Sequence, residues 1–338
     1  MKRCLELAAL GRSYVSPNPL VGAVVVHNDK IIGEGYHQRY GQAHAEVVAI
    51  ASVADKSLLK DSTIYVSLEP CAHFGKTPPC ANLIVEHQIP RVVMAMEDPF
   101  LQVSGKGRQI LLNAGIQVIS GVLENEAREL NKFFLTYIEK HRPYITLKWA
   151  TSADGFIDDF NPSPKALTSK ETNIWAHTIR SYYDAILVGF NTALKDNPSL
   201  TVRHVNRPSP KRFVIDLNLD LPHELQLFSD VLPLYILNTK REEVEGKKIY
   251  KKLDASKPLH EEVARVMYEL KIQSVLVEGG AATHKMFLDA GLWDEILEFE
   301  TPVKIGDGIK KALEPKDSLK GQCVYSNELD QVFSYINK

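Results

Sequence analysis

Three residues with metal-binding side chains and one glutamate lie near one another in the chain: His44, Glu46, Cys71 and Cys80. A catalytic zinc ion takes three protein ligands and keeps a fourth position for water, and a glutamate that is not a ligand can move protons for that water. Zinc nucleobase deaminases carry such a set as H-x-E followed by P-C-x-x-C. The segments H-A-E at 44–46 and P-C at 70–71 fit this pattern, although eight residues rather than two separate the cysteines. The spacing predicts a zinc site with ligands His44, Cys71 and Cys80, and with Glu46 as the catalytic acid–base residue.

This set of residues predicts a hydrolytic deamination. Zinc lowers the pKa of bound water to about 7, which gives a hydroxide that can attack an amidine-like ring carbon. Glu46 can take a proton from the water and deliver it to the ring nitrogen and the departing amine. Residues two apart on a regular helix do not share a face, so His44 must stand at a helix start for Glu46 to reach the same site. We also expect the positive end of that helix to favour the ionised form of Glu46.

Two other interpretations of the same residues remain open. Structural zinc sites usually close with four protein ligands, and His73, between the cysteines, could be the fourth. The alternative is that no zinc binds at all. The joint occurrence of H-A-E, a strand, E-P-C and a second cysteine favours the catalytic site.

Length and composition limit the class of protein. A chain of 338 residues predicts two domains. A net charge of −2, with acids and bases mixed along the chain, argues against a nucleic-acid binder but allows a small charged substrate. We expect no membrane helix and no cleavable signal, and hence a cytoplasmic enzyme. Four cysteines do not suggest a disulfide scaffold, and Cys4 and Cys323 are expected to be small core residues.

The first half of the chain alternates predicted strands with predicted helices, as in a mostly parallel sheet covered on both faces. This predicts one domain over 1–141. Its expected helices cover 1–10, 43–53, 80–87, 105–115 and 124–140, and its expected strands cover 21–26, 30–35, 63–68, 91–96 and 116–120.

A second α/β pattern begins after His141-Arg142-Pro143 and predicts a domain over 142–338. A strand, two glycines and a helix follow one another around Gly279-Gly280, and such a turn can bind an anion through backbone N–H groups. No G-x-G-x-x-G follows a strand, so a Rossmann cofactor site is not supported. The expected helices are 169–181, 261–270 and 281–290, and the expected strands are 144–150, 184–189, 212–216, 232–237, 274–277, 295–300, 322–326 and 331–336, with a proline-rich loop over 158–165.

The first half resembles the deaminase half of the bifunctional deaminase–reductase family of riboflavin biosynthesis. The resemblance rests on P-N-P-L-V-G at 17–22, G-E-G-Y-H at 33–37, H-A-E at 44–46, L-E-P-C at 68–71 and G-K-T-P-P-C at 75–80. The eight-residue gap between the cysteines is the family's own pattern. The resemblance implies a cytidine-deaminase-like αβα sandwich that deaminates a diaminopyrimidine bearing a ribosylamino 5′-phosphate. It also implies a substrate pocket shaped by Asn18, His73, Lys76 and Asp98. The chain departs from the family at Phe100, where D-P-N-P or D-P-D-P is usual.

The second half resembles the reductase half of the same family, whose fold is similar to dihydrofolate reductase. The matching segments are L-K-W-A-T-S-A-D-G at 147–155, V-G at 188–189 with D-N-P-S-L-T-V-R at 196–203, E-G-G at 278–280 and L-W-D-E at 292–295. The resemblance implies reduction of the ribosyl group to ribityl. The implied NADPH contacts are Ala150, Thr168, Thr192, Gly280, Ala281, Ala282, Thr283, His284, Lys285 and Met286, and the implied substrate contacts are Lys148, Arg180, Asp196, Leu200, Arg203 and Glu278.

The chemistry of these residues suits such a substrate. Arg180 and Arg203 suit bidentate binding of a phosphate. Asp196 and Glu278 suit the hydroxyl groups of a ribose or a ribityl chain. The chain departs from the family at Ala166, where a tryptophan is usual, so an aromatic surface near the cofactor is not expected here.

Three hypotheses about function follow. The first is a bifunctional zinc- and NADPH-dependent enzyme that deaminates the pyrimidine and then reduces its sugar. The second is an active deaminase with an impaired reductase half. The third is a non-enzymatic zinc- and nucleotide-binding protein or a polynucleotide-editing deaminase, which the absence of a basic, aromatic groove disfavours. We expect a homo-oligomer, a dimer or tetramer, that acts on a small molecule.

Overall fold

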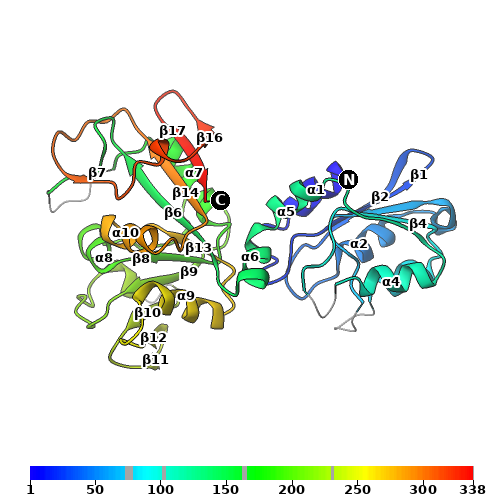
Figure 1. The fold of residues 1–338 in the computed structure, drawn as a ribbon, viewed down its shortest axis with the longest axis horizontal. Coiled ribbons are helices and arrows are strands. Elements are labelled where there is room, and N and C mark those ends of the chain that lie inside the picture. The colour runs from blue at the N-terminus through cyan, green and yellow to red at the C-terminus, as the bar shows by residue number, and fades with distance from the viewer. Residues whose placement is uncertain (73–78, 101–103, 162–165, 230–231, 338) are drawn as a thin grey trace. The chain divides into compact units, whose positions relative to one another are not determined.

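The chain forms two compact units, Met1–His141 and Arg142–Lys338 (Figure 1). The structure is a computed structural model, and it describes residues 1–72, 79–100, 104–161, 166–229 and 232–337. His73 and Lys76, which the sequence places in the substrate pocket, lie outside these residues. None of the helices in the described part of the chain is long and apolar enough to cross a membrane.

The first unit is built on a five-stranded sheet in the order β2-β1-β3-β4-β5. β1 pairs antiparallel with β2 and with β3, whereas β3, β4 and β5 run parallel. Because β3 and β4 run parallel, the segments that follow them leave the sheet at the same edge. The strands are β1 (Gly22–His27), β2 (Lys30–Tyr36), β3 (Thr63–Val66), β4 (Arg91–Met94) and β5 (Gln117–Ile119).

Helices cover both faces of this sheet. Alternate residues of a strand point to opposite faces, so Val25 and Ile64 pack under one set of helices and Val24 under another. The first set is α2 (Ala45–Ser52), α3 (Cys80–Glu86) and α4 (Lys106–Asn113); the second includes α1 (Lys2–Ala9), α5 (Glu124–Leu130) and α6 (Lys132–Lys140). The predicted αβα sandwich is confirmed.

The prediction of a single helix over 124–140 is wrong, because two helices cover this segment. The chain leaves helical geometry at Asn131 (φ −102°, ψ 17°) and continues as a second helix. The side chain of Asn131 is buried, and it accepts the N–H of Leu20 at 2.8 Å and donates to its carbonyl at 3.0 Å. This pairing anchors the loop that carries Asn18, one of the predicted pocket residues.

The second unit contains a ten-stranded sheet in the order β11-β12-β10-β9-β8-β13-β6-β14-β17-β16. The strands from β12 to β14 in this order run parallel, and β17 and β16 follow antiparallel at one edge. Their bounds are β6 (Tyr144–Thr151), β8 (Ala185–Val188), β9 (Lys211–Ile215), β10 (Leu234–Asn238), β11 (Glu243–Glu245), β12 (Lys248–Lys252), β13 (Ser274–Val277), β14 (Glu295–Glu300), β16 (Gly321–Ser326) and β17 (Gln331–Ile336).

The helices of the second unit also divide between the two faces. α9 (Leu259–Glu269) and α10 (Ala281–Asp289) pack on the largest core cluster, which includes Leu147 and Phe213. α7 (Lys170–Arg180) packs against Phe299, and α8 (Phe190–Asp196) packs on a third cluster. A short pair of strands, β7 (Phe156–Asp158) and β15 (Ile309–Lys310), forms a separate two-stranded sheet. The predicted α/β fold of this half is confirmed.

The sequence did not predict α8, and one of the two cysteines that it predicted to be buried is exposed. α8 has only seven residues, fewer than the about 11 or more over which apolar periodicity identifies a helix. Cys4 is buried as predicted, but Cys323 is exposed. It lies in β16, which has a neighbouring strand on one side only and is exposed along most of its length.

Candidate active sites

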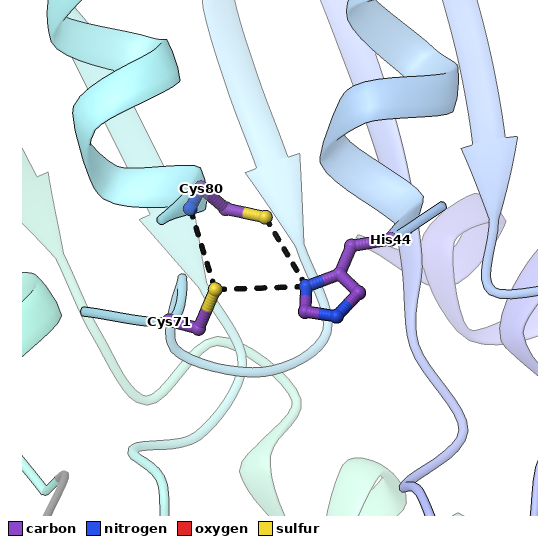
Figure 2. A group of neighbouring side chains, drawn as sticks. All are labelled: His44, Cys71 and Cys80. Atoms are coloured by element: carbon purple, nitrogen blue, oxygen red, sulfur yellow. Dashed lines mark hydrogen bonds between the residues drawn. The ribbon is translucent and has the colours of Figure 1, made fainter. Parts of the chain in front are cut away.

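The three predicted zinc ligands come from three different elements. His44 is the N-cap residue of α2, with extended backbone geometry (φ −72°, ψ 162°), so the predicted helix start is where the structure has it. Cys71 follows the carboxyl end of β3, and Cys80 is the first residue of α3. Figure 2 shows the two sulfur atoms turned toward the ring of His44.

The atoms that would bind the metal are already close enough to share one ion. Nδ1 of His44 lies 3.5 Å from Sγ of Cys71 and 3.3 Å from Sγ of Cys80, and all three ligand atoms lie within 4.8 Å of one another. Zn–N and Zn–S bonds at tetrahedral angles imply a nitrogen–sulfur separation of about 3.6 Å. The residues present therefore fit a zinc ion.

Glu46 lies in the first turn of α2 and is buried, at 3% exposure. Burial, and secondarily the charge of Cys71, raise its pKa to about 7. Desolvation of the carboxylate thus outweighs the field of the helix start, which by itself favours the ionised form of Glu46. A bound divalent cation would act the other way and lower this pKa. Either way, a carboxyl group that titrates near neutrality suits proton transfer.

The E-P-C segment is fastened to the loop between β4 and α4. The buried carboxylate of Glu69 accepts the N–H groups of Asp98 (3.2 Å), Gly105 (3.0 Å) and Arg108 (3.0 Å). α4 also approaches so closely that a Cβ on Gly107 would lie 1.9 Å from the carbonyl oxygen of Pro70, which explains the glycine there. Glu69 thus joins the strand end that carries Cys71 to the loop that carries Asp98. The sequence motif contains Glu69, but its spacing gave no indication of this role.

Of the predicted pocket residues, Asn18 is held by a histidine to which the sequence assigned no role. Nδ1 of His37 lies 3.0 Å from the carbonyl oxygen of Ala43, which only accepts, so Nδ1 carries the proton. Nε2 of His37 then accepts from the amide of Asn18 at 3.0 Å. Burial lowers the pKa of His37, which keeps the ring neutral in this arrangement. Asp98 is half-buried and accepts the N–H of Phe100, whose side chain is exposed.

In the second unit, three predicted substrate residues form one half-buried charge network. Glu278 follows β13, and its carboxylate accepts hydrogen bonds from Nε (3.0 Å) and Nη2 (2.8 Å) of Arg180. Nζ of Lys148 lies 4.0 Å from the same carboxylate. Burial acts to raise the pKa of Glu278, but Arg180 and Lys148 outweigh it and hold the pKa at about 2. Burial also lowers the pKa of Lys148. The guanidinium fork of Arg180, predicted to bind a phosphate, is therefore already occupied by Glu278.

The other predicted substrate residues lie at the last residue of α8 and on the loop that follows it. Asp196 and Arg203 line a cavity of about 450 Å3 together with Ser199, Thr201 and Arg212. The side chain of Leu200 does not line this cavity but is buried in the core, so only its backbone can meet a ligand. Arg212 is fully buried, and its Nε has no hydrogen-bond partner among the described residues.

The predicted cofactor residues meet at the turn before α10. Oγ1 of Thr192 accepts the N–H of Gly280 at 2.7 Å, and Gly280 is the N-cap of α10. The side chain of His284 faces the core instead, with Nε2 at 3.2 Å from the carbonyl oxygen of Val277, so it offers no side-chain contact to a cofactor.

The remaining cofactor candidates differ in exposure. Lys285 is exposed and pairs with Asp289 at 2.9 Å, and Met286 packs partly on the core. Ala150 and Thr168 are half-buried, in β6 and in the loop before α7. The backbone N–H groups at the start of a helix can bind an anionic group of a coenzyme. The other two positions, Ala281 and Ala282, open α10, with Thr283 after them.

Comparison with known proteins finds a match for each of the two units. A family model described as the cytidine and deoxycytidylate deaminase zinc-binding region matches residues 1–96, and one described as the RibD C-terminal domain matches residues 143–335. The chain is 44% identical to the riboflavin biosynthesis protein RibD of Aquifex aeolicus, over 91% of this chain and 88% of that protein. It is 41% identical to RibD of Bacillus amyloliquefaciens, over 93% and 86%.

Two solved structures are similar over nearly their whole length. One is a diaminohydroxyphosphoribosylaminopyrimidine deaminase/5-amino-6-(5-phosphoribosylamino)uracil reductase from Thermotoga maritima, 37% identical, with a TM-score of 0.91 over 100% of this chain and 97% of that chain. The other is RibD of Acinetobacter baumannii, 32% identical, with a TM-score of 0.89 over 99% and 97%.

Fold and site together define a zinc-binding deaminase unit followed by a reductase unit in one chain. Each of the two matched regions corresponds to one of the two units. The chain belongs to the RibD family of riboflavin biosynthesis proteins. It is therefore a bifunctional enzyme, a hydrolase and an oxidoreductase, whose reductase unit uses NADPH.

Proposed function

We propose that the first unit removes one amino group from 2,5-diamino-6-(5-phosphoribosylamino)pyrimidin-4-one. The observation that carries this proposal is the cluster of His44, Cys71 and Cys80 with Glu46 buried beside it. These three ligands would hold zinc, which supplies an acidified water as nucleophile near neutral pH. The name of the Thermotoga maritima relative describes the same deamination.

The residues of this unit would move the protons and orient the ring. Glu46 takes a proton from the attacking water and gives it to the departing amino group, so the ring carbon gains an oxygen and ammonia leaves. Asn18 and Asp98 would hold the pyrimidine. His73 and Lys76 complete the predicted pocket from outside the described residues.

The second unit would then reduce the ribosyl group of the deaminated product to ribityl. Bound NADPH would supply the hydride that reduces C1′, and the ring oxygen would take a proton as its bond to C1′ breaks, which opens the sugar. Glu278 and Asp196 would bind sugar hydroxyls, with Lys148 beside the Glu278 carboxylate. Arg203 and the backbone of Leu200 would bind the 5′-phosphate. Arg180 would not bind the phosphate itself, because its guanidinium group holds Glu278 and the carbonyl of Thr201.

The coenzyme would bind at the start of α10. Thr192, Gly280 and the following residues to Met286 would hold it there, with Ala150 and Thr168 at its edge. In this proposal His284 contributes through its backbone. No finding favours an impaired reductase half, since the network of Lys148, Arg180 and Glu278 is complete.

We also infer the cellular compartment and the oligomeric state of the enzyme. Free thiols at Cys71 and Cys80 suit a reducing compartment, so the enzyme would act in the cytoplasm. A dimer or tetramer is the expected assembly, and light scattering of the purified chain measures it.

A chelation experiment on the full chain tests the proposal. Removal of zinc by a chelator abolishes ammonia release from the diaminopyrimidine, because the nucleophile depends on the metal. NADPH consumption on the separately prepared deaminated substrate continues, because the three zinc ligands all belong to the first unit. Restored zinc, measured per chain, restores ammonia release. Ammonia release at the full rate from metal-free protein would contradict the assignment.

A further inference from the structure

His177 is a buried histidine that the reaction itself does not use. It lies in α7, three residues before Arg180, and is 2% exposed. Its Nδ1 accepts the backbone N–H of Arg203 at 3.2 Å. The ring of His204 covers it edge-on, with ring centroids 4.6 Å apart. A residue of α7 thus holds the backbone of the arginine that we assign to the substrate phosphate.

The hydrogen bond fixes the protonation state of the ring. A backbone N–H can only donate, so Nδ1 must be unprotonated and the proton of the neutral ring resides on Nε2. Burial, together with the charges of Arg180 and Arg203, lowers the pKa of His177 to about 4. The acceptor is therefore present throughout the neutral pH range.

The loop that ends at Arg203 needs such anchors. Asn197 (φ 43°) and Leu200 (φ 55°) have left-handed backbone geometry, which is strained for a leucine and persists only when surrounding contacts enforce it. Nη1 of Arg180 donates to the carbonyl of Thr201 at 2.9 Å, and the N–H of Val202 donates to Oγ of Ser209 at 2.9 Å.

His177 supplies the next anchor along the loop. Its partner is residue 203 itself, whose guanidinium group lies at the cavity of about 450 Å3 beside Ser199, Thr201 and Arg212. Arg203 is exposed, and Nη1 of its guanidinium group donates to Oγ of Ser199 on the same loop. The direction of the side chain therefore depends on the loop backbone that carries both residues.

We propose that His177 is a positioning residue of the reductase unit, which fixes the backbone of Arg203 so that its guanidinium group meets the substrate phosphate. This rests on the proposed function of Arg203. His177 touches neither substrate nor coenzyme in this role. It affects binding of the phosphorylated substrate and leaves binding of NADPH unchanged.

A pair of amide substitutions tests the position of the acceptor. The Oδ1 atom of asparagine is as many bonds from the backbone as Nδ1 of histidine, whereas Oε1 of glutamine is one bond further. His177→Asn should keep the KM for the deaminated substrate within about 2-fold of wild type. His177→Gln should raise it roughly 2- to 10-fold, the range expected for one lost hydrogen bond.

Further measurements separate positioning from a general loss of structure. The inhibition constant of inorganic phosphate should rise with the KM in His177→Gln, while the KM for NADPH and the deaminase rate of the same chain stay unchanged. Equal KM values for the two variants, whether both normal or both raised, would overturn the proposal. So would a raised KM for NADPH without a change in phosphate inhibition.

A third variant distinguishes this inference from the proposed function. Arg203→Met should raise both the substrate KM and the phosphate inhibition constant by more than His177→Gln does. If Arg203→Met changes neither, the assignment of Arg203 to the phosphate fails. If Arg203→Met behaves as expected and His177→Gln equals His177→Asn, only the role of His177 fails.

Discussion

Two carboxylates, a buried one in the first unit and a half-buried one in the second, have pKa values shifted in opposite directions. Burial raises the pKa of Glu46 to about 7, whereas Arg180 and Lys148 overcome the effect of burial on Glu278 and hold its pKa at about 2. A group that titrates near neutrality can exchange protons during a reaction, and one far below neutrality remains a fixed charge. Glu46 is thereby suited to acid–base catalysis and Glu278 to binding and orientation.

Replacement of Glu46 by glutamine tests this at the level of one residue. The amide cannot carry a proton between water and the amine, so Glu46→Gln should lower the deamination rate roughly 10²- to 10⁴-fold. Zinc content should remain that of wild type, because Glu46 is not among the three ligands. Reduction of the separately supplied deaminated substrate provides the internal control. A variant that releases ammonia at the wild-type rate would show that Glu46 is misassigned.

At the scale of elements, the deaminase site depends on segments that meet only through tertiary contacts. Glu69, after β3, receives N–H groups from the N-cap residue of α4 and from Arg108 in its first turn. A carboxylate at a helix N-terminus satisfies N–H groups that have no partner within the helix. The side chain of Glu69 thus acts as the cap of α4 from a distant part of the chain.

Glu69→Gln should loosen this connection, because the amide keeps one acceptor oxygen in place of two. We expect the free energy of unfolding of the first unit to fall by roughly 1–3 kcal/mol, the range for a hydrogen bond to a charged group. Hydrogen exchange measures the effect at the amides of Gly105 and Arg108. The matched control is Glu97→Gln, an exposed carboxylate 4.0 Å from Arg108, which should change stability by less than about 0.5 kcal/mol. Equal exchange rates in both variants would show that Glu69 does not cap α4.

At the scale of the whole molecule, the two units can be observed separately. All three tryptophans, Trp149, Trp175 and Trp293, belong to the second unit, so intrinsic fluorescence reports on that unit. The same unit contains two buried histidines, His177 and His284, whose pKa values are lowered to about 4, primarily by burial. Unfolding returns both to their usual value of about 6.5.

This difference predicts acid sensitivity of the second unit. A histidine with a lowered pKa in the folded state takes up its proton more readily when unfolded, so stability is full above pH 6.5 and is lost as pH falls toward 4. Each group contributes at most about 1.4 kcal/mol per pH unit in that window. The fluorescence-monitored melting temperature should fall between pH 6.5 and 4.5. His177→Asn, which does not titrate, should flatten the dependence; an unchanged slope would contradict this account.

The sequence by itself determined the chemistry of the first unit and the class of both folds. His44, Glu46, Cys71 and Cys80 are recognisable because few combinations of these residue types at this spacing serve another purpose. Strands and helices of the sheets were recognisable because their apolar periodicity is local. The exceptions include α8 and the strands β7, β11, β12 and β15, which the sequence did not predict, and the break at Asn131, which pairs with Leu20.

Only the tertiary structure decided which polar side chains hold one another. Arg180 meets Glu278 across 98 positions of sequence, so its predicted phosphate fork is occupied. Glu69 anchors a loop 29 to 39 positions away, and His177 holds the backbone of Arg203. Such contacts depend on how distant segments pack, and no local pattern of residue types encodes that packing. Residue types determine which reaction is possible, and the packing within each unit determines which side chains remain free to take part.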